Sequence, residues 1–155
     1  MRLEEKQALR RWEEFHRSLS SSIFVDTSLS QREVDTLRRR LEADPIAWIT
    51  HLFPSYAKYP FAPFQRQAIL RIIQHEEWYE VLSWSRNLAK STVAMFVLLY
   101  LALTGRKRFV ICASATKDAA IRLLTPFRIS LSSNARLRQL YGEQETLGAW
   151  TEDEF

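Results

Sequence analysis

The sequence predicts an α/β protein, with part of a parallel sheet in the second half of the chain and an α-helical N-terminal segment before it. From residue 79 onward, short apolar segments typical of buried strands alternate with longer helical patterns. The order strand, loop, helix, strand, helix is typical of a parallel sheet with right-handed crossovers. Because residues 1–60 lack this alternation, we divide the chain into a helical segment at 1–60 and the first part of an α/β domain at 61–155.

Helical spacing and capping signals predict four helices in the first half of the chain. Ser30 and Glu33 have the spacing of a capping box, and Asp44-Pro45 combines a favoured N-cap with proline at the first helical position. Three prolines between residues 54 and 63 indicate a loop. The helices are expected at 3–19, from Ser30 to about Glu42, from Pro45 through the apolar stripe that ends at Phe53, and from Pro63 to about Gln74.

The second half carries the alternating pattern. Gly105 is well placed to end a helix in the left-handed conformation, and Ser114 or Thr116 to cap the next helix. The elements expected are, in order, a strand at 79–84, a polar loop at 85–89, a helix from about Lys90 to Leu103, a second strand at 108–113 and a helix to about Leu131.

Composition restricts the class of protein without identifying a function. The 155 residues include 46% hydrophobic and 26% charged residues, the balance of a globular domain with a core. The net charge of +4 is compatible with a polyanionic partner but does not establish one. The longest apolar run, 93–103, is shorter than the roughly 20 residues that a membrane span needs. Cys112 is the single cysteine, which fits a reducing cytosol, and we expect a soluble, cytoplasmic protein.

The segment 85–92, SRNLAKST, has some features of a phosphate-binding loop. Against the pattern G-x-x-x-x-G-K-[ST], Lys90 and Ser91 match, while Trp84 and Ala89 stand where the glycines belong. Inward-turned backbone amides and the helix N-terminus can bind phosphate without glycine. We expect Ala89 to meet a need for a small side chain rather than for a positive φ. Helix capping by Ser91 and Thr92 explains the same residues equally well on spacing alone.

A resemblance to a known family favours phosphate binding over helix capping at 85–92. The stretch Ser85-Arg86-Asn87-Leu88-Ala89-Lys90-Ser91-Thr92 resembles the glycine-poor Walker A of viral terminase large subunits, the ATPases that drive DNA into phage and herpesvirus capsids. The resemblance implies an incomplete P-loop NTPase sheet of the ASCE type, with ATP and Mg²⁺ as cofactors. It implies that these eight residues bind the nucleotide, that the Ser91 hydroxyl ligates Mg²⁺ and that Arg86 senses or stabilises the γ-phosphate.

The sequence on either side of the loop extends the resemblance. Gln65, in the phrase PFQRQ, stands where the family has a glutamine that contacts adenine, although an exposed position on an amphipathic helix explains it as well. Residues 109–120 are similar to the family segment that faces DNA or couples it to ATP. Ser114, Thr116 and Lys117 are the candidates there, with a plain helix cap as the alternative role for Thr116.

Other family features are missing from the sequence. No apolar run leads into an Asp-Glu pair, as a Walker B strand would, and no nuclease carboxylate cluster follows. We therefore expect the N-terminal ATPase portion of a longer, phage- or prophage-encoded terminase acting in the host cytosol. The resemblance implies double-stranded DNA, the portal, the small terminase subunit and a homo-oligomeric ring as partners. The alternatives are a helicase-like P-loop ATPase and a non-enzymatic remnant or adaptor.

Overall fold

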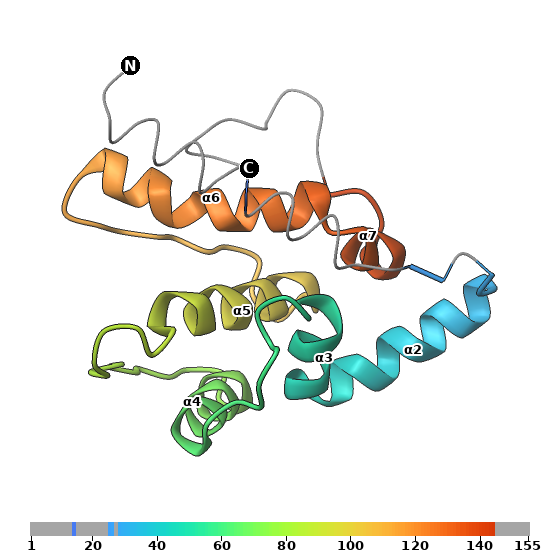
Figure 1. Ribbon diagram of the computed structural model, residues 1–155, viewed down its shortest axis with the longest axis horizontal. Helices are drawn as coiled ribbons and strands as arrows, with labels where there is room; N and C mark the ends of the chain where they lie inside the picture. The colour runs from blue at the N-terminus through green and yellow to red at the C-terminus, as the bar shows by residue number, and fades with distance from the viewer. Residues whose placement is uncertain (1–13, 15–24, 27, 145–155) are drawn as a thin grey trace.

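The described part of the chain is helical throughout. The computed structural model describes residues 14, 25–26 and 28–144, so the helix expected at 3–19 lies almost entirely outside them. No described helix is both long and apolar enough to cross a bilayer. The helices, labelled in Figure 1, are α2 (Gln31–Ala43), α3 (Pro45–Leu52), α4 (Pro63–Gln74), α5 (Lys90–Leu103), α6 (Lys117–Ser133) and α7 (Ala135–Tyr141).

The predicted parallel sheet, and with it the α/β fold class, is wrong for this structure. Residues 79–84 and 108–113 contain no β-strand and carry the chain back to the start of the next helix (Figure 1). The large side chains at alternate positions face outward: Tyr79 is 88% exposed, Val81 65%, Phe109 87% and Ile111 84%. A parallel strand depends on neighbouring strands and on cover over both faces. Within the described residues these segments have neither, so their apolar composition alone does not produce strands.

The helix boundaries that depend on local capping are confirmed. Glu33 accepts hydrogen bonds from the Ser30 amide (2.8 Å) and hydroxyl (2.6 Å) at the start of α2. Asp44 Oδ1 accepts from the amides of Ile46 (3.0 Å) and Ala47 (3.1 Å) at the start of α3. Gly105 has a φ of 71° just after α5, as expected for a left-handed terminator. These boundaries were predictable because each depends on residues close together in sequence.

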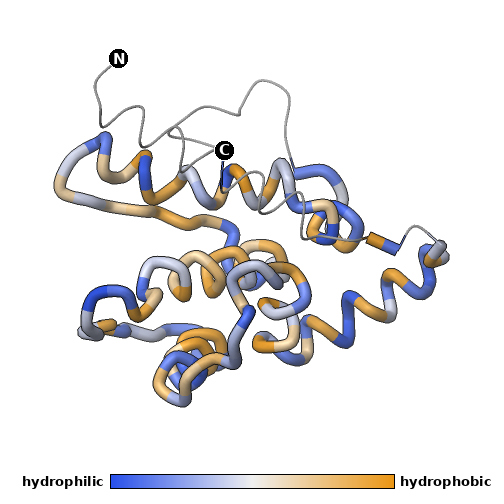
Figure 2. Tube along the Cα trace, viewed as in Figure 1, coloured by the Kyte–Doolittle hydropathy of each residue, from blue (hydrophilic) through white to orange (hydrophobic). Residues whose placement is uncertain are grey.

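Helix α5 lies at the centre of the core and contacts α3, α4 and α6. Its buried side chains include Phe96 and Tyr100, which pack on the aromatic residues Phe53 and Trp48 of the α3 region. Figure 2 shows how α2, at the edge, alternates between hydrophilic and hydrophobic residues. The central position of α5 explains why its sequence is apolar on most faces.

Helix α7 was not predicted from the sequence, although it joins the C-terminal part of the described chain to the first helices. Asn134 is fully buried between α6 and α7; its Nδ2 donates to the Leu52 carbonyl (2.8 Å) and its Oδ1 accepts from the Leu137 amide (3.1 Å). The Tyr141 hydroxyl accepts from Trp48 Nε1 (2.8 Å) and donates to Glu42 Oε1 (3.0 Å). These long-range hydrogen bonds join the C-terminal part of the described chain to α2 and α3.

The stability of this junction is expected to fall at acidic pH through His51. Burial, and then the positive charge of Arg136, lower the pKa of His51 from its ordinary value of 6.5. The folded state then binds fewer protons than the unfolded state, so this contribution is complete above pH 6.5 and is lost as the pH falls below it. Urea unfolding at pH 7.5 and at about pH 5 should show a smaller loss of stability for His51→Gln than for the wild type. Equal losses would contradict the assignment.

Candidate functional site

The loop 85–89 contains two residues with left-handed backbone. Asn87 and Ala89 have positive φ values, 64° and 58°, whereas Leu88 between them does not. Alternation of left-handed and right-handed backbone brings successive N–H groups into a concave arrangement that suits an anion. The expectation that Ala89 meets only a need for smallness was wrong, because this position requires a left-handed conformation.

The N-terminus of α5 directly follows this loop and has no side-chain cap. The amides of Lys90, Ser91 and Thr92 form the first turn, and none of them donates to an acceptor among the described residues. The capping alternative for Ser91 and Thr92 is therefore not what the structure shows. Free first-turn amides and the partial positive charge of a 14-residue helix favour an anion at this position.

Lys90 folds back over the loop. Its ammonium donates to the carbonyl oxygens of Trp84 (2.5 Å), just before the loop, and Ser85 (2.9 Å), the first residue of the loop. The ammonium is thus held beside the loop that contains the two left-handed residues Asn87 and Ala89. A lysine in this place can neutralise phosphate without a large change of backbone.

Gln65 belongs to the same region, as predicted, but its contacts are within the protein. Its Oε1 accepts from the Ala62 amide at the start of α4 (3.0 Å), and its Nε2 donates to the carbonyl of Leu88 (3.1 Å). The neighbouring Phe64 ring packs edge-on against Trp84, with centroids 4.9 Å apart. Helix α4 therefore braces both ends of the loop, and the contact of Gln65 with adenine stays a prediction.

The remaining predicted site residues are Arg86, in the loop, and Ser114, Thr116 and Lys117, around the start of α6. Arg86 is exposed and makes no hydrogen bond or ion pair with the described residues, so it is available to a ligand. Thr116 caps α6 by accepting from the Ala119 amide (3.3 Å), which confirms its alternative role as a helix cap. Ser114 is exposed just before it, and Lys117 begins α6. A role of these three residues in DNA contact or coupling stays a prediction.

Mg²⁺ would have to be held largely by the nucleotide. No group of three or more His, Cys, Asp or Glu side chains in the described ranges could hold a metal ion. The Ser91 hydroxyl is exposed at the first turn of α5 and can supply one oxygen ligand. Mg²⁺ is commonly bound by few protein ligands together with phosphate oxygens and water, so the residues present fit a nucleotide-borne ion.

Replacing Ala89 with glycine tests the strained position. A non-glycine residue in the left-handed region costs about 1–2 kcal/mol, which exceeds the roughly 0.4–1 kcal/mol of added chain freedom that glycine brings to the unfolded state. Ala89→Gly should therefore raise the free energy of unfolding by several tenths of a kcal/mol or more. Ala102→Gly, the same change within α5, should lower it by up to about 1 kcal/mol. Urea denaturation distinguishes the two, and a destabilised Ala89→Gly would contradict the φ assignment.

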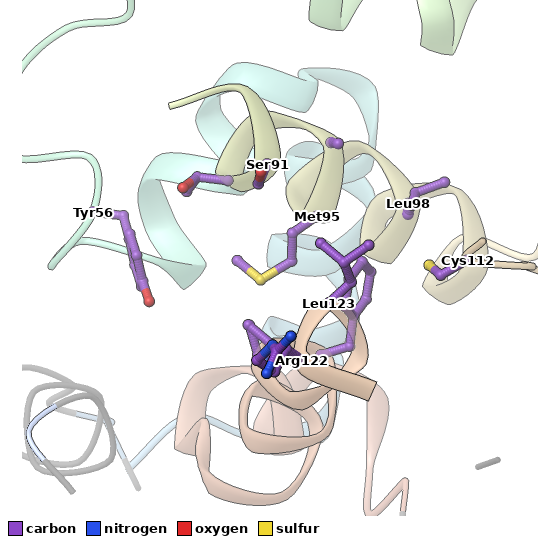
Figure 3. Close-up of a pocket in the computed structure, with 11 residues that line it drawn as sticks. Tyr56, Ser91, Met95, Leu98, Cys112, Arg122 and Leu123 are labelled. Carbon is purple, nitrogen blue, oxygen red and sulfur yellow. The ribbon is translucent and has the colours of Figure 1, made fainter. Parts of the chain in front are cut away.

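One feature near the loop carried no signal in the sequence. A cavity of about 300 Å³ lies between α5 and α6, and Ser91 and Thr92 contribute to its lining (Figure 3). Its walls come from segments far apart in sequence, such as Tyr56 and Phe127, and their meeting depends on helix packing that periodicity does not reveal.

The described site thus consists of a loop with two left-handed residues, an uncapped helix N-terminus, a lysine folded beside it and a glutamine that contacts the loop.

Comparisons with protein-family models, with curated proteins and with solved structures found no match.

Proposed function

We propose that this chain binds ATP–Mg²⁺ at the loop 85–92, as the nucleotide-binding portion of a DNA-packaging ATPase of the terminase kind. The observation that carries the proposal is the uncapped start of α5, where the amides of Lys90, Ser91 and Thr92 have no acceptor among the residues that the structure describes. Phosphate oxygens satisfy such amides and interact favourably with the helix dipole.

Each group at the loop would have a distinct role in binding the nucleotide. The amides of 87–92 would hold the phosphates, Lys90 would neutralise their charge, and Ser91 would give Mg²⁺ one oxygen. Arg86, exposed and unpaired among the described residues, would add positive charge beside the γ-phosphate. Mg²⁺, when bound, would offset the charge of the β- and γ-phosphate oxygens. Because the sequence contains no apolar run ending in Asp-Glu, the proposal for this chain is binding rather than hydrolysis.

The link to DNA packaging rests on the resemblance of 85–92 and its flanks to terminase large subunits. This link makes double-stranded DNA, the portal and the small terminase subunit the proposed partners. It also implies a ring of identical subunits. The net charge of +4 is compatible with DNA as one of them.

Calorimetric titration with ATP–Mg²⁺ and with AMP tests the proposal. In the proposed complex most contacts are to the β- and γ-phosphates, so AMP should bind at least about tenfold more weakly than ATP. Absence of ATP binding, or equal affinities for ATP and AMP, would contradict it.

A second candidate is a non-enzymatic adaptor. The observation that favours it is the exposure of Tyr79, Val81, Phe109 and Ile111, because large exposed apolar side chains often mark protein contacts. An adaptor of this kind would bind no ATP, so the same titration separates the two candidates.

A further inference from the structure

The side chain of Gln65 links helix α4 to the loop 85–89. Its Oε1 accepts from the Ala62 amide at the start of α4 (3.0 Å), and its Nε2 donates to the Leu88 carbonyl (3.1 Å), which lies 23 residues later in the chain. Ile69, in the next turn of α4, is fully buried. Gln65 therefore ties the loop to a helix that is itself held by the core.

The hydrogen bond to the Leu88 carbonyl also orients the amide of Ala89. The two groups belong to one peptide unit, which is planar and trans, so its C=O and N–H point in opposite directions. Because the carbonyl is held toward Gln65, the Ala89 N–H points away from it. That amide has no acceptor among the residues that the structure describes, as is also true of the amides of 90–92. Gln65 thus fixes the direction of the first amide in this unpaired run.

The conformation that this hydrogen bond holds is strained, because the loop contains no glycine. Asn87 (φ 64°) and Ala89 (φ 58°) flank Leu88 in the left-handed region, which non-glycine residues adopt only at a cost in free energy. Rotation of the peptide unit between Leu88 and Ala89 would return Ala89 to a negative φ and reverse the direction of its N–H. The hydrogen bond from Gln65 opposes this rotation, since the Leu88 carbonyl would lose its donor.

We propose that Gln65 is a positioning residue that holds the loop 85–89 in its phosphate-binding conformation. The inference rests on the proposed function and deepens it: in a loop without glycine, Gln65 stabilises the left-handed backbone at Ala89. The Gln65 side-chain amide has two protons, and one of them serves Leu88. The positioning role is therefore compatible with the predicted contact between Gln65 and adenine.

A ligand without a base isolates the positioning role. Gln65→Ala should weaken the binding of inorganic tripolyphosphate with Mg²⁺ about three- to tenfold, as expected for one lost hydrogen bond, and should weaken ATP–Mg²⁺ at least as much. Gln67 is an exposed glutamine of the same helix that makes no hydrogen bond with the described residues. Gln67→Ala should therefore leave both affinities, measured by titration calorimetry, unchanged.

Two readouts separate positioning from general destabilisation. Glycine adopts a positive φ at little cost, so Ala89→Gly added to Gln65→Ala should restore most of the tripolyphosphate affinity, whereas Ala102→Gly added to Gln65→Ala should restore none. In the free Gln65→Ala protein, the ¹³C chemical shifts of Ala89, which depend on backbone conformation, should differ from those of the wild type. Gln65→Met keeps the length of the side chain without either hydrogen bond and replaces Gln65→Ala in every measurement should Gln65→Ala fail to fold.

The outcomes distinguish failure of this inference from failure of the proposed function. Unchanged tripolyphosphate affinity in Gln65→Ala, with or without a loss of ATP affinity, would overturn the positioning role while leaving phosphate binding intact. Absence of rescue by Ala89→Gly, or unchanged Ala89 chemical shifts in Gln65→Ala, would overturn it as well. Failure of the wild type to bind either ATP or tripolyphosphate would overturn the proposed function and the positioning role with it.

Discussion

Lys90→Ala is expected to weaken the binding of ATP–Mg²⁺ strongly. The ammonium of Lys90 lies beside the loop, held on the carbonyl oxygens of Trp84 and Ser85, and in the proposed complex it is the cation closest to the phosphates. A charge-assisted hydrogen bond is worth about 1.5–3 kcal/mol, and nearby phosphate charges increase the loss. A fall in affinity of roughly tenfold to a few hundredfold, measured by calorimetry, is the expected result.

A matched control, Lys107→Ala, distinguishes a specific role of Lys90 from the effect of removing any lysine. Lys107 also donates through its ammonium to a backbone carbonyl, that of Glu76 (2.6 Å), but at the opposite end of α5. Lys107→Ala should leave ATP affinity unchanged, and Lys90→Arg should retain part of the binding. If Lys90→Ala destabilised the fold yet bound ATP like the wild type, Lys90 would be a structural brace of the loop and the site assignment would fail.

Trp48→Ala is expected to cause the largest loss of stability. Trp48 is fully buried, its ring packs against those of Phe53, Tyr100 and Tyr141, and its Nε1 donates to the Tyr141 hydroxyl. Truncating a buried tryptophan to alanine typically costs about 3–5 kcal/mol through lost burial and the cavity left behind. For a domain of this size that is a large fraction of the total stability. Urea unfolding followed by circular dichroism measures the change.

Two further variants show how much of the stability lost in Trp48→Ala depends on the hydrogen bond and how much on burial. Trp48→Phe keeps an aromatic ring but loses the hydrogen bond to Tyr141, so it should cost less than Trp48→Ala. Trp78→Ala removes a tryptophan that is 46% exposed and should cost much less than Trp48→Ala. Equal losses for Trp48→Ala and Trp78→Ala would contradict the description of the core.

Sequence reasoning identified the helices well where their ends depend on local chemistry. The starts of α2, α3 and α4 and the end of α5 follow from Ser30, Asp44, Pro63 and Gly105. Helix α7 was missed because it is short and its cap, Asn134, has its second hydrogen bond to Leu52, 82 residues earlier. No local pattern could show that contact.

The predicted sheet failed for a related reason. The apolar runs at 79–84 and 108–113 satisfy the composition of strands, but strand formation depends on partners elsewhere in the chain. For the candidate site, Gln65 donates to the Leu88 carbonyl beside the loop, and the adenine contact that the resemblance implied for it stays a prediction. The order of residues did not reveal the positive φ of Ala89, the missing cap of α5 or the cavity beneath Ser91, since these are properties of backbone geometry and helix packing.

The central claim, that phosphate binds the uncapped start of α5, is tested most directly by amide NMR. On addition of ATP–Mg²⁺ to the ¹⁵N-labelled protein, the backbone amide signals of Lys90, Ser91 and Thr92 should shift strongly, because their N–H groups gain acceptors. Tripolyphosphate should shift the same three signals. Unchanged signals at these residues under saturating ATP–Mg²⁺ would contradict the account.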